Sequence, residues 1–200
     1  MGGIGHKQNS FFKTRYDFRY CHGGELRKER AGRGQRPLST KKSHHVVFKV
    51  NKSKLKTKSL RLGYSFSLIR QLLRKYSFRF FVKIEQVSIQ NDHIHILIRT
   101  NRRSHYHYFF RVVAGQIAQQ FEREGLLAKA VTDTPKPGHA KGTRLWKYRP
   151  FSRVIKGGRR AYDTIRNYIQ LNEQEAKGMI KYQKNRLRGL SSSDWELLWA

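Results

Sequence analysis

Residues 91–100 have the sequence NDHIHILIRT, in which two histidines stand one residue apart within a segment of strand-forming residues. Because side chains alternate between the two faces of a β-strand, His93 and His95 are expected on the same face. The other face would carry three isoleucines that can enter a hydrophobic core, Ile94, Ile96 and Ile98. Strand histidines are often satisfied by neighbours or solvent. Two on one face, opposite an apolar face, also suit half of a metal site.

The overall charge indicates a polyanionic partner. The chain has 200 residues, 43 Lys and Arg against 13 Asp and Glu, and a formal net charge of +30 at pH 7. Each phosphate that a lysine or arginine neutralises releases condensed counterions, so such a chain is expected to bind nucleic acid. A membrane surface is also anionic, but no apolar segment is long enough to span a bilayer and no basic amphipathic stretch dominates. We therefore expect nucleic acid, and no membrane, as the partner.

The cysteine content and the first residues indicate the cellular compartment in which the protein is expected. Cys21 is the only cysteine, which excludes an internal disulfide and a cysteine-cluster zinc site. The first ten residues, MGGIGHKQNS, lack the apolar stretch of a secretory signal. A cytoplasmic protein is the simplest expectation.

Composition divides the chain into three parts. Residues 1–42 are rich in Gly, Lys and Arg and cannot bury enough apolar surface to fold alone, so we expect a flexible arm that contacts DNA. Residues 43–178 carry the patterns of a folded domain. Residues 179–200 form a basic C-terminal tail.

The folded domain shows both strand and helix patterns. β-Branched or alternating segments predict strands over residues 44–50, 78–89, 93–99 and 145–155. Apolar residues at helical spacing predict helices over residues 59–76, 102–124 and 161–177. This order indicates an α+β, ferredoxin-like fold with a mainly antiparallel sheet and helices packed on one face. The opposite face would be free to meet a ligand.

The last predicted helix carries a second pair of polar residues. Tyr168 and Asn172 are four residues apart, so their side chains lie on one flank of the helix. Such a pair is common at the boundary between core and solvent. A phenol can also attack phosphorus as a nucleophile, and an amide oxygen can bind a hard divalent cation. Together with His93 and His95, Asn172 would hold Mg²⁺ or Mn²⁺ and leave open positions for a phosphate.

A strand with His-Ile-His followed by a helix with Tyr-x-x-x-Asn resembles the single-tyrosine HUH transposases of the IS200/IS605 type, and more closely the REP-associated tyrosine transposases. Supporting stretches are RPLSTKKSHHVVFKV, LWKYRPFSRVI and NYIQLNEQEAKG, so the resemblance covers roughly residues 36–178. It implies that His93, His95 and Asn172 are metal ligands and that Tyr168 is the nucleophile. Some relatives have glutamine at the third ligand position, which leaves the preferred metal open.

The resemblance also implies a reaction and an assembly. The expected protein is a metal-dependent endonuclease and strand transferase. It would cut single-stranded DNA at or near a hairpin through a 5′-phosphotyrosine and rejoin strands. Gly157 and Gly158 would form a hinge that lets the tyrosine helix dock on its own body or on a partner's. The protein would be a monomer or a helix-swapped homodimer in the bacterial cytoplasm, associated with the nucleoid.

Basic residues near these motifs are the expected DNA contacts. They are Arg33, Arg36, Lys41, Lys42, Arg99, Arg102, Arg103, Lys147, Arg149 and Arg153. Contacts of this kind to phosphates contribute affinity and salt dependence rather than sequence choice. Trp146 and Phe151 could stack on unpaired bases, although a simpler interpretation places both in the core.

Other protein classes fit parts of the sequence. A non-catalytic basic nucleic-acid-binding protein on the same fold fits the composition equally well, and only the two motifs argue against it. Replication initiators and relaxases share the tyrosine nucleophile but normally need a larger chain. Tyr162 is not a convincing second nucleophile, because six residues of helix turn it away from Tyr168. Histidine-triad hydrolases need a third alternating histidine, where this chain has Leu97.

Overall fold

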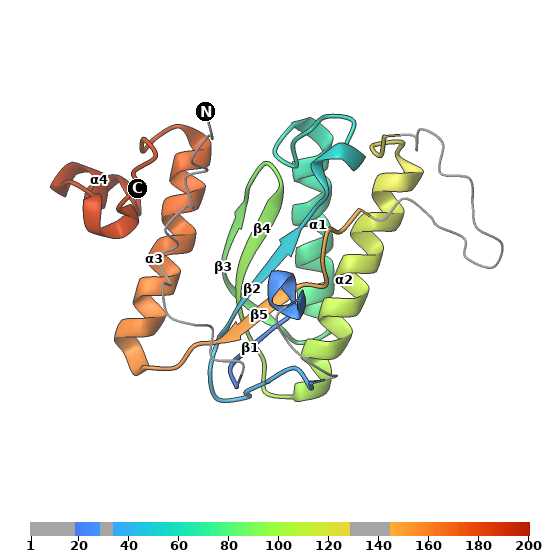
Figure 1. Cartoon of the computed structure of the whole chain (residues 1–200), viewed down its shortest axis with the longest axis horizontal. Coiled ribbons are helices and arrows are strands. Elements are labelled where there is room, and N and C mark those ends of the chain that lie inside the picture. The colour runs from blue at the N-terminus through green and yellow to red at the C-terminus, as the bar shows by residue number, and fades with distance from the viewer. Residues whose placement is uncertain (1–18, 29–33, 129–144) are drawn as a thin grey trace, which may run out of the picture.

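Five strands form one antiparallel sheet in the order β1-β5-β2-β4-β3 (Figure 1). The structure is a computed structural model that describes residues 19–28, 34–128 and 145–200. The strands are β1 (Cys21–His22), β2 (His44–Lys49), β3 (Lys83–Ile89), β4 (His93–Arg99) and β5 (Phe151–Val154). The central strand β2 pairs with β4 and β5, and β3 forms one edge of the sheet.

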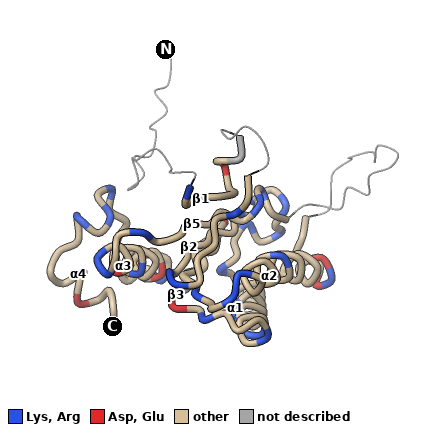
Figure 2. Tube along the Cα trace, turned by 90° about the horizontal axis from the view of Figure 1, so that it is seen from below, with Lys and Arg blue, Asp and Glu red and all other residues tan. Residues whose placement is uncertain are grey.

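Helices cover both faces of this sheet. The described residues form α1 (Gly63–Arg79), α2 (Arg103–Arg123), α3 (Gly158–Lys177) and α4 (Ser192–Leu197), with short 3₁₀ turns at Gly24–Lys28, Lys52–Lys54 and Arg186–Gly189. α1 and α2 cover one face, whereas α3 lies on the other face with α4 beyond it (Figures 1 and 2). The predicted α+β fold with an antiparallel sheet is confirmed. The prediction that the helices pack on one face of the sheet holds only for α1 and α2.

The alternation within β4 explains why α3 takes the histidine face. The isoleucines of this strand are buried in the core under α1 and α2: Ile94, Ile96 and Ile98. Leu97 points to the other face and packs with Ile165 and Ile169 of α3. Leu97, beside the histidines, and Ile155 therefore provide apolar contacts on which the last long helix docks.

The strand predicted over residues 78–89 is wrong in its first part. Phe78 and Arg79 continue α1, and β3 begins only at Lys83. Phe81 has a φ of 51°, in the left-handed region, and turns the chain from the helix into the strand. Aromatic residues favour strands in a propensity argument, but here Phe78 belongs to the helix, and Phe80 and Phe81 close it.

Part of the predicted arm belongs to the sheet. β1 pairs with β5 through Cys21↔Arg153 and His22↔Ser152. Cys21 and Leu26 of this segment are buried. Arg33 and the rest of residues 1–18 and 29–33 lie outside the described residues. Within the described ranges, no helix has the length and apolar character needed to cross a membrane.

A buried histidine makes folding sensitive to acid. The ring of His44 lies 4.3 Å from that of Tyr106 between centroids, and its Nε2 accepts a hydrogen bond from the Ser39 N–H. Burial, and then the charge of Arg36, lower the pKa of His44 from 6.5 to about 4. The folded state therefore binds fewer protons than the unfolded state between these values, so stability falls as the pH falls through this range. Because one pKa unit corresponds to about 1.4 kcal/mol, we expect His44 to account for a loss of roughly 3 kcal/mol in unfolding free energy.

Urea unfolding from pH 7 down to pH 4 measures this loss. Glutamine cannot take up a proton in this pH range. In His44→Gln, the slope of unfolding free energy against pH should therefore correspond to the uptake of up to about one proton fewer on unfolding. An unchanged dependence in the variant would mean that other groups are responsible.

Candidate functional site

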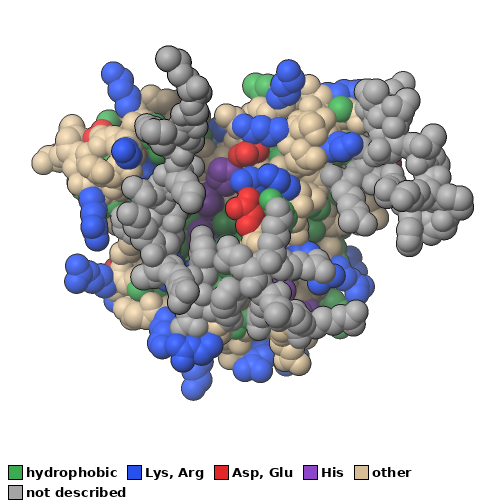
Figure 3. All heavy atoms as spheres, in the orientation of Figure 1, with side chains coloured by type: hydrophobic (Ala, Val, Ile, Leu, Met, Phe, Trp, Pro, Cys, Tyr) green, Lys and Arg blue, Asp and Glu red, His purple; other side chains and the backbone are tan. Residues whose placement is uncertain are grey.

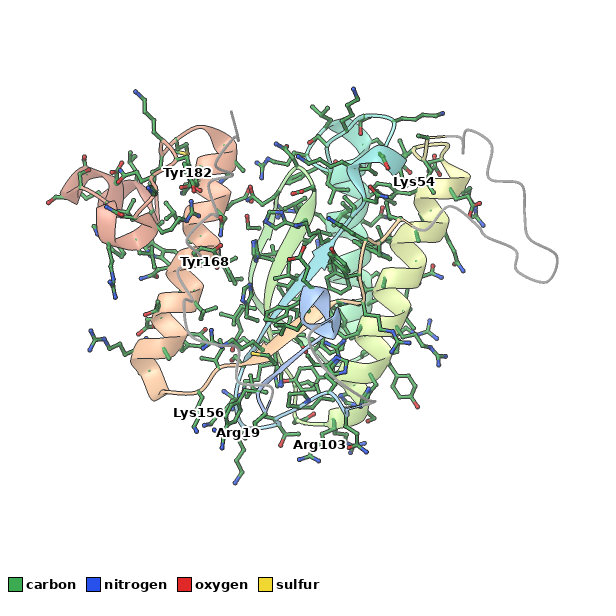
Figure 4. The ribbon with its side chains drawn as sticks, viewed as in Figure 1. Arg19, Lys54, Arg103, Lys156, Tyr168 and Tyr182 are labelled. Atoms are coloured by element: carbon green, nitrogen blue, oxygen red, sulfur yellow. The ribbon has the colours of Figure 1, made fainter. Side chains whose placement is uncertain are left out.

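Two strands and one helix bring three histidines and a tyrosine together. His93 and His95 of β4 have ring centroids 4.6 Å apart. His45 of β2 stacks on His95 with 5.1 Å between the centroids, and Tyr168 of α3 meets His95 edge-on at 5.7 Å. Figure 4 labels Tyr168 on α3, and Figure 3 shows histidine side chains (purple) within a recess of the same view. The predicted nucleophile thus lies next to the predicted metal ligands.

Each histidine of β4 uses its Nδ1 within the protein. His93 Nδ1 donates to Asp92 Oδ1 at 2.6 Å, and His95 Nδ1 lies 2.9 Å from His45 Nε2. The hydrogen bond from His93 is the largest cause of the lowered pKa of Asp92. Metal-binding histidines commonly hold one ring nitrogen in this way and offer the other to the metal. Nε2 of both rings is therefore the nitrogen that could bind a cation.

Burial keeps the two inner histidines neutral. Burial, followed by the charge of Arg153, lowers the pKa of His45 to about 3. The pKa of His95 lies well below its usual value, mainly because of burial and then because of His93. A neutral imidazole has the lone pair that a metal needs, so these surroundings suit a ligand rather than a charged partner.

The apolar side of α3 places Tyr168 and Asn172. Ile165 and Ile169 contact Leu97, which holds the helix over the histidine face. Tyr168 lies beside this contact and is half-buried. Asn172 follows one turn later, is buried, and donates from Nδ2 to the Tyr168 carbonyl oxygen at 2.8 Å. The two residues therefore lie one turn apart on α3, and the ring of Tyr168 meets His95.

An arginine from the tail holds the amide oxygen of Asn172. Arg186 Nη2 donates to Asn172 Oδ1 at 2.7 Å, and Nη1 donates to both carboxylate oxygens of Glu175 at 2.7 and 2.8 Å. The guanidinium also lies over the rings of Tyr168 and Tyr182, 5.3 and 5.1 Å from their centroids. Metal binding by Asn172 would compete with this hydrogen bond, because both use Oδ1.

Apolar contacts dock the tail that carries Arg186 onto α3. Ile180, Leu187 and Leu198 are buried and pack with Leu171 of the helix. A capping box starts α4, in which the Ser191 hydroxyl accepts from the Asp194 N–H and the Asp194 carboxylate accepts from the Ser191 N–H. The last residues are thus part of the folded body around α3.

Two glycines make the turn from β5 into α3. Gly157 and Gly158 have φ values of 109° and 70°, which L side chains rarely adopt. A side chain at Gly157 would also bring its Cβ within 3.1 Å of Ala161 Cβ. Glycine is therefore required by the local backbone, and the role of this pair as a hinge stays a prediction.

The predicted DNA contacts lie in different surroundings. Arg153 is the cross-strand partner of His45 and lies on the histidine face. Arg36 donates to Ser152 Oγ at 2.5 Å and to Pro150 O at 2.8 Å, and burial lowers its pKa to about 10. Arg36 therefore ties its segment to β5, and its contact with DNA stays a prediction. The remaining described members of the set are exposed: Lys41, Lys42, Arg99, Arg102, Arg103, Lys147 and Arg149.

The two aromatic candidates near β5 also differ. Trp146 packs on Phe48 at 5.4 Å between centroids, and its Nε1 donates to the Ala114 carbonyl oxygen at 2.8 Å. It belongs to the core, as the simpler interpretation holds. Phe151 lies edge-on to His45 at 6.4 Å and is half-buried beside the site.

Sequence reasoning missed His45. The signal was available in residues 44–50, HHVVFKV, because alternation separates His45 from the apolar Val46 and Phe48. The signal pointed to no partner, however. Only the pairing of β2 with β4, in which Val47 opposes His95 and His45 opposes Leu97, brings the two rings together.

Comparison with solved structures identifies a similar fold. A REP-associated tyrosine transposase bound to a REP hairpin gives a TM-score of 0.52 at 14% sequence identity, covering 76% of this chain and 77% of that chain. A candidate transposase from Deinococcus radiodurans gives a TM-score of 0.39 at 13% identity, covering 72% of this chain and 98% of that chain. No protein-family model and no curated protein matches the sequence. The chain is therefore similar in fold, at low sequence identity, to a REP-associated tyrosine transposase.

Proposed function

We propose that the protein is a metal-dependent, single-tyrosine endonuclease and strand transferase that acts on single-stranded DNA at or near a hairpin. The observation that carries this proposal is the position of Tyr168, whose ring lies 5.7 Å from that of His95 and is followed one turn later by Asn172. A phenol beside two metal-binding imidazoles is the minimum set for attack on a phosphodiester.

The donor set suits a hard divalent cation, Mg²⁺ or Mn²⁺. His93 and His95 each keep Nε2 for the metal, since Nδ1 is engaged by Asp92 and His45 respectively. Asn172 would supply an amide oxygen in place of its hydrogen bond to Arg186. When bound, the cation would polarise the scissile phosphate and stabilise the charge that develops on it.

The proposed cleavage has a simple balance of bonds. The phenol of Tyr168 loses its proton to solvent, and its oxygen attacks phosphorus. The bond from phosphorus to the 3′ oxygen breaks, and that oxygen takes up a proton and leaves as a 3′-OH. The 5′ phosphate stays on Tyr168, and attack by another 3′-OH would reverse the steps and join two strands. No nucleotide cofactor is needed, because the phosphotyrosine conserves the energy of the broken diester.

Single-stranded or hairpin DNA is the proposed partner for two reasons. The structurally similar REP-associated transposase is bound to a REP hairpin. The net charge of +30 favours a polyphosphate over any neutral substrate. Arg153, on the histidine face, is a candidate contact to a phosphate near the scissile bond.

The test is formation and mapping of a covalent protein–DNA adduct. The wild-type protein is incubated with labelled hairpin oligonucleotides that carry single-stranded flanks, in Mg²⁺, in Mn²⁺ or with a chelator. We expect a band that survives denaturation and appears only with metal. Digestion and mass spectrometry should place the nucleotide on the peptide that contains Tyr168. Tight binding without an adduct under any of these conditions would instead support a non-catalytic nucleic-acid-binding protein.

A further inference from the structure

The end of α1 carries phenylalanine where helices commonly end in glycine. The Val82 N–H donates to Ser77 O at 2.9 Å, and the Phe81 N–H donates to Phe78 O at 3.2 Å. This pair of bonds is the Schellman arrangement, which places a left-handed residue, usually glycine, at the position of Phe81. Phe81 has a φ of 51°, and 75% of its surface is exposed. A bulky side chain there strains the backbone and gains little burial, so its presence indicates a use outside folding.

Other aromatic side chains lie at the same end of the molecule. Phe78, in the preceding turn, is 87% exposed. His105 at the start of α2 lies against Phe81 with 5.7 Å between the ring centroids. Tyr108, also exposed, stacks on Phe80 at 6.0 Å. This is the end of the molecule at which Arg103 is labelled in Figure 4.

Cations and the two exposed phenylalanines line one hollow at this end of the molecule. Arg74, Lys75 and Lys83 border a hollow of about 880 Å³ together with Phe78 and Phe81. No carboxylate is among the described residues that line it. Figure 2 views the molecule from this end, where Lys and Arg (blue) are frequent along α1 and α2. Phe78, Phe81 and these three cations are called the aromatic patch below.

A second hollow continues from the aromatic patch along the edge strand β3. It shares Ile84 with the first, has a volume of about 520 Å³, and lies between residues of α1 and α3. Its cations are Arg61, Arg70 and Lys177. Its two carboxylates have partners, because Glu173 pairs with Arg61 at 3.0 Å and Glu85 accepts from Ser43 Oγ at 2.6 Å. The helix α3 therefore presents Lys177 to this hollow and Tyr168 to the histidines.

We propose that the aromatic patch binds unpaired bases of a DNA strand whose backbone follows the edge of β3 from α3. Exposed rings stack on bases of any sequence, and neighbouring cations neutralise the phosphates between them. The inference rests on the proposed function only in taking single-stranded DNA as the ligand. It adds a binding site for the strand on the α1 side of the sheet, away from the face that holds the histidines.

A second copy of this chain is the other occupant that exposed aromatics suggest. Two patches meeting face to face would bring Arg74, Lys75 and Lys83 of each copy together, in chains that each carry a net charge of +30. Like charges at close range oppose such a contact, whereas a polyanion is attracted by the same residues. Charge complementarity therefore favours nucleic acid.

The test measures DNA affinity in a Tyr168→Phe parent, in which no covalent step interferes. The probes are a fluorescent single-stranded oligonucleotide and the same backbone with abasic sites in place of bases. Phe78→Ser/Phe81→Gly is expected to weaken binding of the first probe by about tenfold or more and to leave the abasic probe unaffected. Trp195→Ser, which removes an exposed aromatic ring from α4, is the matched control and should change neither affinity.

Folding is checked by thermal unfolding of each variant. Glycine suits the left-handed position of Phe81, so the double variant should unfold at the same temperature as the parent or higher. A loss of affinity then reports the missing rings rather than a damaged domain.

Two results would overturn the proposal. One is an unchanged affinity for the base-containing probe, or an equal loss on the abasic probe. The other is a concentration-dependent dimer of the parent that the double variant loses while its DNA affinity stays the same, which would assign the patch to self-association. Failure of the proposed function is seen separately, as the absence of an adduct with wild-type protein.

Discussion

Phenylalanine at position 168 is expected to abolish the covalent protein–DNA adduct and strand transfer while leaving hairpin binding intact. The substitution removes one oxygen atom, which is the nucleophile in the proposed reaction. The ring itself remains, and with it the edge-on contact with His95 and the position under the Arg186 guanidinium. Affinity should be preserved, because the cations proposed to bind phosphates are untouched. Denaturing gels measure the adduct, and fluorescence anisotropy measures binding.

Tyr182 provides the matched control for this experiment. The same guanidinium lies over both rings, 5.3 Å from the centroid of Tyr168 and 5.1 Å from that of Tyr182. Tyr182 is exposed, whereas Tyr168 is half-buried and lies edge-on to His95 at 5.7 Å between the ring centroids. Tyr182→Phe should therefore form the adduct as the wild type does. An adduct that persists in Tyr168→Phe and disappears in Tyr182→Phe would contradict the assignment of the nucleophile.

Periodic patterns predicted the elements that frame the site. The strand over residues 93–99 is confirmed as β4, because alternation of histidine and isoleucine has a period of two that no helix shares. The helix predicted over residues 102–124 is confirmed as α2 (Arg103–Arg123), and the helix over residues 161–177 as the greater part of α3. The four-residue spacing of Tyr168 and Asn172 predicted that the two residues lie one turn apart on the helix, where the Asn172 side chain bonds to the Tyr168 carbonyl oxygen; the role of Asn172 as a metal ligand stays a prediction.

Long-range pairing and unusual backbone conformations were beyond prediction. His45 enters the site only through the register of β2 against β4, which a single sequence does not encode locally. Arg186 donates to Asn172 from a turn in which it has a φ of 55°. No sequence pattern in the tail predicts that conformation. The strand prediction was wrong near Phe81 because this residue also has a left-handed conformation, with a φ of 51°. Left-handed conformations of non-glycine residues break the usual link between residue type and local structure.

Loss of His95 should remove metal-stimulated cleavage, whereas loss of His45 should only lower the affinity for the metal. His95 is a proposed ligand, so His95→Ala leaves His93 as the single imidazole donor. His45 would act on the proposed metal through His95, because its Nε2 lies 2.9 Å from His95 Nδ1. Replacing such a partner of a ligand typically lowers metal affinity about 10–100-fold. His45→Phe should therefore need about 10–100-fold more Mn²⁺ for half-maximal adduct formation, with a maximal rate close to that of the wild type.

A conservative variant separates orientation of His95 from simple packing. His45→Gln offers a side-chain oxygen that can accept a hydrogen bond from His95 Nδ1, so it should recover part of the Mn²⁺ affinity lost in His45→Phe. His107→Ala, which removes an exposed histidine from α2, controls for metal bound elsewhere and should behave as the wild type. Direct Mn²⁺ titration in the Tyr168→Phe background gives the same ranking without catalysis. If His45→Phe fails at every Mn²⁺ concentration while binding the metal normally, His45 acts on the reacting groups themselves, and its role as a support for His95 is wrong.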